Sequence, residues 1–396
     1  MLRNITVGID IGTSQVKVVV SELVKNDEDS RKSIPKILGI GTAESKGMRH
    51  GYITNINEVS NSISLAVKQA EKTSGIKINR AYVSIGGIGI SSTTSTGTTI
   101  TSRADLHITD LDIEKASINC EENIPINLSQ NQKVLHSIPL SYKIDGKPVL
   151  TKTPLDMKGT KLEVKMLFIT CLEPHINDLL EAVDAVGIDV IDVMASPIAS
   201  SFVTLSKIQK NAGCLLINIG SETMSIVVFE NNIPVSLEIF PIGGTDITND
   251  IALGLKIPLE EAENIKIGSI GSGTYPKKKL EEIISARLTD MFELIENHLK
   301  KIGRNGLLPA GIFITGGGAG MHSIEDFAKS QLKLPSRIAE ISNLSEKNSQ
   351  RNNIVSVAYG LCVLGFSKEE KSSLGIRNTG HKILGKIWSW IKQFSP

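Results

Sequence analysis

The chain has 396 residues, of which 40% are hydrophobic and 21% charged, and its formal net charge is +1. This length allows two or more domains with sizeable cores, and the near-neutral charge argues against general nucleic-acid binding. Its four cysteines and seven histidines show no metal-ligand spacing. Because there is no signal peptide and no apolar run of about 20 residues, the sequence predicts a cytoplasmic protein that does not span a membrane.

The first predicted element is a β-hairpin over residues 5–20. Alternating apolar residues end in a Gly12-Thr13-Ser14 corner, and a second apolar run leaves it. Gly12 lets a ligand approach the backbone, Thr13 and Ser14 offer donors to a phosphate, and Asp10 offers a carboxylate to hydrated Mg²⁺. Taken alone, the pattern is more often that of a purely structural hairpin.

The elements that follow alternate between strands and helices, and one stretch stands apart from them. In residues 86–164, strand-like runs rich in Ser and Thr, a helix that opens near Thr109 and scattered prolines predict a small inserted α+β subdomain. A decorated loop region is the alternative. On either side of this stretch we expect a turn at 25–36, a strand at 37–43, helices at 56–74, 174–186 and 196–207, and strands at 80–85 and 189–193.

The hairpin pattern of the N-terminus recurs two hundred residues later. Residues 216–228 (LINIGSETMSIVV) align with residues 8–20 without a gap, so that Gly220 matches Gly12 and Ser221 matches Thr13. Such repetition predicts two related domains, each presenting a hairpin to a shared cleft. Two facing phosphate-binding hairpins resemble the ATP site of the actin, Hsp70 and sugar-kinase superfamily.

Glycine-rich corners and helices complete the expected cleft. A Gly243-Gly244 corner leads into a helix capped by Thr or Asp, and a helix at 258–266 places Glu263 and Lys266 on one face. A long helix is expected at 277–301, and an apolar helix at 353–366. Between them, a strand from residue 311 ends in three glycines, which let the backbone approach a nucleoside.

With PIGGTDITNDIA at 241–252, AENIK at 262–266 and HSIPLSYKIDG at 136–146, the chain resembles the FtsA family of actin-like bacterial cell-division proteins. The resemblance implies an α/β, actin-like two-domain fold (duplicated RNase H-like domains) with an inserted α+β subdomain and a C-terminal amphipathic helix. It also implies ATP and Mg²⁺ between the halves, with Asp10 holding the metal through water. The implied contacts are Asp10, Gly12, Thr13, Ser14, Gln15, Lys17, Gly220, Ser221, Glu222, Thr223, Gly243, Gly244, Glu263, Lys266, Gly316, Gly317 and Gly318.

The same resemblance divides the chain into segments. The first actin-like domain is split by the insertion, and the second is split by a small subdomain of its own. The expected segments are 1–85 and 165–209 for the first domain, 86–164 for the insertion, 210–253 and 310–366 for the second domain, 254–309 for its small subdomain, 367–380 for a flexible linker and 381–396 for a membrane-targeting helix.

Three positions depart from the superfamily pattern. Asn218 stands where a carboxylate normally helps to hold Mg²⁺, and Glu222 places a negative charge near the expected phosphate unless its side chain turns away. Ser196 precedes a proline where many hydrolysing relatives have a glutamate that positions the attacking water. We therefore expect nucleotide binding with slow or absent hydrolysis, so that ATP acts as a conformational ligand.

The last sixteen residues form an amphipathic pattern. On a helical wheel the apolar side chains occupy one arc, and lysines and other polar residues, Lys386 and Lys392 among them, occupy the opposite side. A short basic helix with Trp at its boundary is suited to an anionic membrane surface, although docking on the protein's own core or in a partner's groove are alternatives. The expected membrane-binding residues are Ile383, Leu384, Lys386, Ile387, Trp388, Trp390, Ile391, Lys392 and Phe394.

The resemblance implies an ATP-binding cell-division protein that polymerises on the cytoplasmic side of the membrane at the division site. It would tether the FtsZ ring by binding the C-terminal peptide of FtsZ through residues 254–309, and recruit other division proteins through the inserted subdomain. Two alternatives stay open. One is a soluble actin-like scaffold of the PilM type, which predicts no lipid binding; the other is an ATPase or kinase of the same fold, which Asn218 disfavours.

Overall fold

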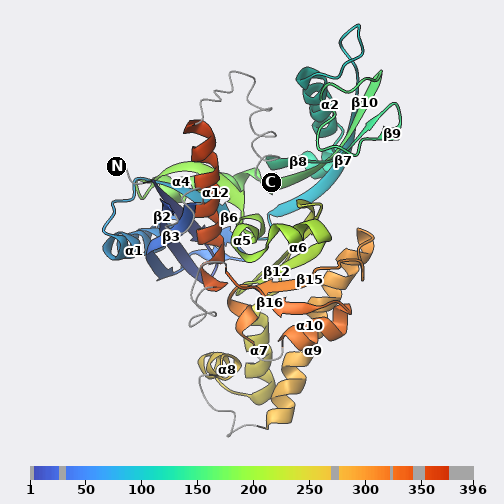
Figure 1. The fold of residues 1–396 in the computed structure, drawn as a ribbon. Helices are drawn as coiled ribbons and strands as arrows, with labels where there is room; N and C mark the ends of the chain where they lie inside the picture. Colours follow the sequence, from blue (N-terminus) through green and yellow to red (C-terminus); the bar gives the residue numbers. More distant parts are fainter. Residues whose placement is uncertain (1–3, 26–32, 269–275, 322–323, 342–352, 374–396) are drawn as a thin grey trace.

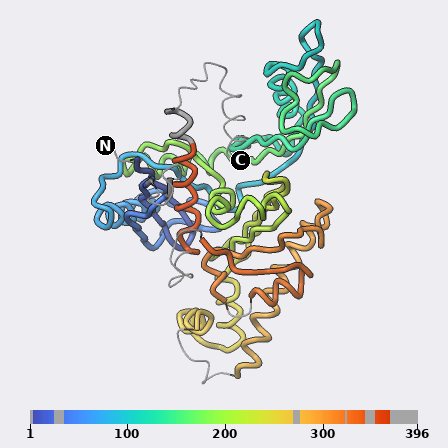
Figure 2. Tube along the Cα trace, in the orientation of Figure 1, coloured from blue at the N-terminus to red at the C-terminus, as the bar shows by residue number. Residues whose placement is uncertain are grey.

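The computed structural model describes residues 4–25, 33–268, 276–321, 324–341 and 353–373. Two five-stranded mixed sheets form the body of the molecule, and a four-stranded sheet stands away from them (Figures 1 and 2). The predicted membrane helix at 381–396 lies outside the described residues. None of the helices in the described part of the chain is long and apolar enough to cross a membrane.

The first sheet has the strand order β11-β6-β1-β2-β3. β1 and β2 form the predicted hairpin, β3 continues the antiparallel meander, and β6 and β11 run parallel to β1. β3 begins at Ser33, inside the turn predicted at 25–36, because its pairing with β2 extends to Lys25. The elements of this half are β1 (Ile5–Ile11), β2 (Gln15–Lys25), β3 (Ser33–Glu44), β4 (Met48–Arg49), β5 (Tyr52–Ile53), α1 (Ile56–Ser74), β6 (Arg80–Ile85), α4 (Glu173–Asp184) and β11 (Asp189–Ala195).

The second sheet repeats the first. Its order, β14-β13-β12-β15-β16, has the same antiparallel meander and the same parallel neighbours as β3-β2-β1-β6-β11. Ile11 pairs with Val16 at the end of the first hairpin, and Ile219 pairs with Met224 at the end of the second. The predicted duplication is thus confirmed strand by strand. Its strands are β12 (Cys214–Ile219), β13 (Met224–Glu230), β14 (Ile233–Phe240), β15 (Gly311–Thr315) and β16 (Ser336–Ile338).

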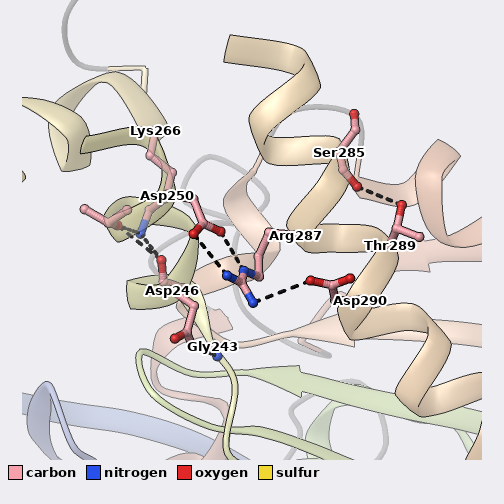
Figure 3. A network of polar contacts seen from close by, with 10 residues as sticks. Gly243, Asp246, Asp250, Lys266, Ser285, Arg287, Thr289 and Asp290 are labelled. Atoms are coloured by element: carbon pink, nitrogen blue, oxygen red, sulfur yellow. Dashed lines mark hydrogen bonds and ion pairs between the residues drawn. The ribbon is translucent and has the colours of Figure 1, made fainter. Parts of the chain in front are cut away.

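Helices of the second half cover one face of this sheet and share its apolar core. Arg287 of α9 donates to both carboxylate oxygens of Asp250 on α7, at 2.6 and 3.0 Å, and lies 3.5 Å from Asp290 (Figure 3). This bidentate pair fixes the crossing of the two helices. The helices are α7 (Gly244–Leu255), α8 (Leu259–Lys266), α9 (Lys277–Lys301) and α10 (Ile324–Leu332).

The inserted subdomain is a compact unit with its own core of buried side chains. Its sheet has the order β7-β10-β8-β9, and α2 packs on β7 and β10. β10 pairs with β7 as far as Cys171, so the insertion ends near residue 172 rather than 164. Its elements are β7 (Ile90–Ile100), α2 (Asp110–Glu122), α3 (Ile126–Ser129), β8 (Gln132–Ile144), β9 (Lys147–Pro148) and β10 (Lys161–Leu172).

One helix packs between the two sheets, and another changes the division expected from chain order. α5 (Ser196–Thr204) packs against α12 (Ser356–Ser373), and α6 (Lys207–Ala212) follows α5 after a break in the single helix predicted at 196–207. α12 packs on β1, β2 and β6 of the first sheet, although it follows the strands of the second. It also continues to Ser373, so residues 367–373 are helical where a flexible linker was predicted.

A buried histidine links α9 to β14, and its burial predicts that the folded chain loses stability in acid. Ser236 Oγ lies 2.7 Å from His298 Nε2, and burial lowers the pKa of His298 to about 4. In the unfolded chain the imidazole of His298 takes up a proton near pH 6.5, whereas in the folded chain it does so only near pH 4. The contribution of the neutral histidine to the free energy of unfolding is therefore complete above pH 6.5 and is lost as the pH falls toward 4. We expect a loss of about 2 kcal/mol from this group between pH 7 and pH 5. Chemical denaturation of the unchanged chain and of His298→Gln at both pH values measures this loss of free energy of unfolding. If the two proteins lose equal stability between pH 7 and pH 5, His298 is not its cause.

Candidate functional site

The two hairpin turns lie on opposite sides of one cavity of about 630 Å³. In the first turn Gly12 N donates to Gln15 O at 3.1 Å, and in the second Gly220 N donates to Thr223 O at 2.9 Å. The aligned positions therefore adopt the same turn. Of the residues predicted to contact ATP, the cavity is lined by Asp10, Gly12, Thr13, Ser14, Gln15, Lys17, Gly220, Ser221, Thr223, Gly244, Glu263, Lys266, Gly316, Gly317 and Gly318.

The carboxylate of Asp10 is held from two sides. Lys17 Nζ donates to its Oδ2 at 3.1 Å, and Ser84 Oγ donates to its Oδ1 at 2.7 Å. Both Asp10 and Lys17 are largely buried at the cavity wall, with 9% and 15% of their side chains exposed. The first turn thus brings one cation and one anion to the cavity, together with the hydroxyl groups of Thr13 and Ser14.

Glu222 is predicted as a contact but does not line the cavity. Its carboxylate Oε2 accepts a hydrogen bond from His50 N at 2.5 Å, across to the first half of the chain. The charge conflict expected from its position in the second turn is therefore reduced, because the side chain points to the neighbouring loop. Asn218, the other departure in this hairpin, lines the cavity beside Gly316.

The glycines after β15 form the wall next to the second hairpin. Gly316 has φ +90°, and a Cβ there would lie 2.2 Å from Asn218 Oδ1 and 2.5 Å from Ile219 O. Only glycine fits this conformation and this approach. Gly317 begins a 3₁₀ turn, η2 (Gly317–Gly320), and a Cβ on it would meet nothing within 4 Å. The backbone is therefore open to the cavity at this point, as the triple glycine predicted.

α7 and α8 provide a third wall through Gly244, Glu263 and Lys266; Figure 3 shows Lys266 with its polar contacts. Lys266 Nζ lies 2.7 Å from Glu263 Oε2 and donates to Thr248 Oγ1 at 2.8 Å and to Gly244 O at 2.9 Å. This network fixes the lysine side chain at the cavity wall. Gly243 does not line the cavity. It is the N-cap of α7, so the cap predicted for Thr or Asp is wrong. Asp246 lies inside the helix, and its Oδ2 accepts from Gly243 N at 2.7 Å.

Several lining residues were not predicted as contacts. Gly51, Gly87 and Ser196 come from the first half, and Ser196 Oγ donates to Ile85 O at 3.0 Å, so its hydroxyl is already committed to the backbone. Asn353 lies before α12, is 4% exposed, and its Oδ1 has no hydrogen-bond partner among the described residues. A buried amide oxygen without a donor at a cavity wall is suited to a ligand donor.

The charged groups around the cavity are few. Among its lining residues the carboxylates are Asp10 and Glu263, and Glu263 is paired with Lys266. Within the described part of the chain, no group of three or more His, Cys, Asp or Glu side chains is placed to hold a metal ion. A metal bound here would therefore need oxygen ligands from water and from a second ligand, which is the usual situation of Mg²⁺ at phosphate sites.

The fold of this chain is similar to that of solved structures. The chain is similar to a chain of the PilM–PilN type IV pilus biogenesis complex, with a TM-score of 0.66 and 16% identity over 91% of this chain and 98% of that one. It is similar to MreB5 of Spiroplasma citri bound to AMPPNP, with a TM-score of 0.53 and 13% identity over 94% and 99%. These features define a protein of the actin-like fold.

Sequence comparisons narrow this class. The family model described as "Cell division protein FtsA" matches residues 215–360, and the model "SHS2 domain inserted in FTSA" matches residues 87–170. The cell division protein FtsA of Borreliella burgdorferi is 31% identical over 99% of both chains. The chain therefore belongs to the FtsA family of cell-division proteins. The resemblance drawn from the hairpins and glycine corners is confirmed, and so is the division function.

Proposed function

We propose that the cavity binds ATP with Mg²⁺. The support is the pair of equivalent hairpin turns, whose N–H and hydroxyl groups are suited to phosphate oxygens. Asp10 would hold the metal through water, because Mg²⁺ at phosphate sites is commonly bound by one or two carboxylates besides the phosphates. The backbone of residues 316–318, the pair Glu263 and Lys266, and the amide of Asn353 would surround the nucleoside.

We further propose that ATP acts mainly as a conformational ligand. Asn218 supplies no second carboxylate, and the hydroxyl of Ser196 is bonded to Ile85 O rather than free to orient water. When bound, Mg²⁺ would neutralise phosphate charge. The residues of this chain would bind and orient the nucleotide between the two sheets, and so favour one arrangement of the halves over another.

In the cell, we propose that the ATP-bound body polymerises and that the tail at 381–396 binds the cytoplasmic face of the membrane at the division site. The small subdomain at 254–309 would bind the C-terminal peptide of FtsZ, and the inserted subdomain would recruit later division proteins. The observation that carries this proposal is the full-length relation to cell-division proteins together with the actin-like cavity. Filaments bound to both FtsZ and lipid would tether the ring.

Co-sedimentation with anionic phospholipid vesicles tests the proposal. The full chain is expected to pellet with vesicles, and more so with ATP, because assembly makes the contact multivalent. A chain ending at Ser373 is expected to stay in the supernatant, and neutral vesicles serve as the control for charge.

If the full chain and the shortened chain both stay in the supernatant, the tail is not a membrane anchor. The soluble PilM-type scaffold then becomes the better account of the fold. If both chains pellet equally, the body carries the lipid contact, and the assignment to residues 381–396 is wrong.

A further inference from the structure

Residues 46–52, here called the strap, connect the two hairpin turns at the cavity wall, which Gly51 lines. At one side of the strap, His50 N donates to Glu222 Oε2 at 2.5 Å, and His50 Nδ1 lies 3.2 Å from Glu222 O. At the other, Gly51 N donates to Thr13 Oγ1 at 3.1 Å. Peptide groups of neighbouring strap residues thus bond to the first turn and to the second.

The strap has little freedom to move as a separate loop. A Cβ on Gly51 would lie 2.3 Å from the Cα of Gly87, so the two backbones touch. His50 has φ +48°, an unusual conformation for a non-glycine residue, and its carbonyl accepts from Ile88 N at 3.3 Å. Tyr52 packs edge-on against the ring of His175, with ring centroids 4.8 Å apart. The strap is therefore fixed to the first half, and Glu222 is its attachment to the second.

The strap lies at the part of the cavity where the hairpin turns face each other. Thr13 and Gly51 line the cavity beside the strap's first attachment, and Ser221 and Thr223 line it on either side of Glu222 in the chain. Moving the turns apart requires the contact between His50 and Glu222 to break. An ionised carboxylate accepting a peptide N–H makes a stronger bond than a neutral acceptor, so the charge of Glu222 strengthens this closure.

We propose that Glu222 is a positioning residue that latches the strap across the two hairpin turns and slows the release of bound nucleotide. This inference rests on the proposed binding of ATP in the cavity. It also accounts for an acidic side chain in a turn that is expected to meet phosphate: the carboxylate closes the site from outside rather than contacting the ligand. Nucleotide exchange would then proceed through a state in which the strap is detached from the second half.

The test uses the full chain and three variants. Glu222→Ala removes the acceptor, Glu222→Gln keeps an oxygen but loses the charge, and His50→Ala keeps the peptide N–H and loses only the ring contact. Release of a fluorescent ATP analogue (mant-ATP) is followed after mixing with excess ATP. We expect release to be about tenfold faster in Glu222→Ala, the size expected for one charge-assisted hydrogen bond, and less accelerated in the other two. Glu121→Ala, on the inserted subdomain, is the matched control and should match the unchanged chain.

Hydrogen exchange of residues 46–52 without nucleotide reports the latch directly. We expect faster exchange there in Glu222→Ala, and not in Glu121→Ala. Equal release rates in Glu222→Ala and the unchanged chain would overturn the retention role, and equal exchange would overturn the latch itself. If neither the unchanged chain nor any variant binds mant-ATP, the proposed function fails and the retention role falls with it, whereas the exchange result still decides whether Glu222 holds the strap.

Discussion

A Gly360→Ala variant is expected to be about 3 kcal/mol less stable than the unchanged chain. In an ordinary helix interior this substitution stabilises by about 1 kcal/mol, because alanine loses less backbone entropy than glycine. Here a Cβ would lie 1.9 Å from the carbonyl oxygen of Ala199, which belongs to the backbone of α5. A backbone atom cannot rotate away, so α5 and α12 must separate. The expected sign is therefore opposite to that of helix propensity.

Denaturant unfolding compares this variant with Gly254→Ala in α7. A Cβ on Gly254 would meet only the end of the Ile283 side chain, at 2.4 Å from its Cδ1, and that flexible group can move. The control is expected to change the free energy of unfolding by less than about 1 kcal/mol. A Gly360→Ala protein as stable as the control would show that α5 and α12 do not pack as closely as the structure has them.

The crossing of α5 and α12 lies next to the cavity, because α12 also contributes a lining residue. Ser356, one turn before Gly360, lines the cavity and lies 3.1 Å from Ser200 Oγ and 3.3 Å from Thr315 Oγ1, so a buried hydroxyl cluster joins α12, α5 and β15. The two halves therefore meet through a hydroxyl cluster of which Ser356 also lines the cavity. Any change in the angle between the halves must alter this cluster.

Local patterns in the sequence were sufficient to predict both hairpins and the site residues that the hairpins carry. The turn at Gly12 and the turn at Gly220 are each determined within a few residues, by alternation of apolar side chains and by glycine at the corner. The amphipathic spacing of α1 predicted its bounds for the same reason: its buried residues repeat on one helical face. Such features need no knowledge of the rest of the chain.

The remaining features depend on contacts between distant segments. The part of α12 from Val357 to Phe366 is buried on nearly all sides, so its sequence does not show which sheet it covers, and it packs on the first rather than the second. The direction of the Glu222 side chain is set by His50, 172 residues away. Asn353 became a candidate only because the fold buries it at the cavity wall with an unpaired oxygen. None of these relations leaves a periodic pattern in the sequence.

The rate of ATP hydrolysis is expected to depend strongly on positions 218 and 196. The double variant Asn218→Asp, Ser196→Glu is expected to release phosphate from ATP about 10²-fold faster than the unchanged chain. The first substitution would add a second carboxylate to the proposed metal site, because Asn218 already lines the cavity with Asp10. A hard divalent cation is bound more firmly by two carboxylates than by one. Phosphate charge would then be neutralised better as it develops.

The substitution at position 196 concerns the orientation of the attacking water. The hydroxyl of Ser196 donates to Ile85 O at 3.0 Å, so it has no free proton to orient water. A glutamate at this first turn of α5 is longer and carries an acceptor, and it lines the same cavity wall, so it would reach a water molecule near the phosphates. Each single variant should give a smaller gain, because it adds only one of the two groups, the carboxylate for the proposed metal or the glutamate that would orient water.

Steady-state phosphate release with ATP in excess measures this effect, and mant-ATP affinity is measured in parallel. Asn57→Asp, on α1 and remote from the cavity, is the matched control for added charge and is expected to leave the rate unchanged. If the double variant binds nucleotide as the unchanged chain does but hydrolyses it no faster, then Asn218 and Ser196 are not what limits hydrolysis. If the unchanged chain already turns over well above once per minute, ATP is consumed rather than held, and its role as a conformational ligand is wrong.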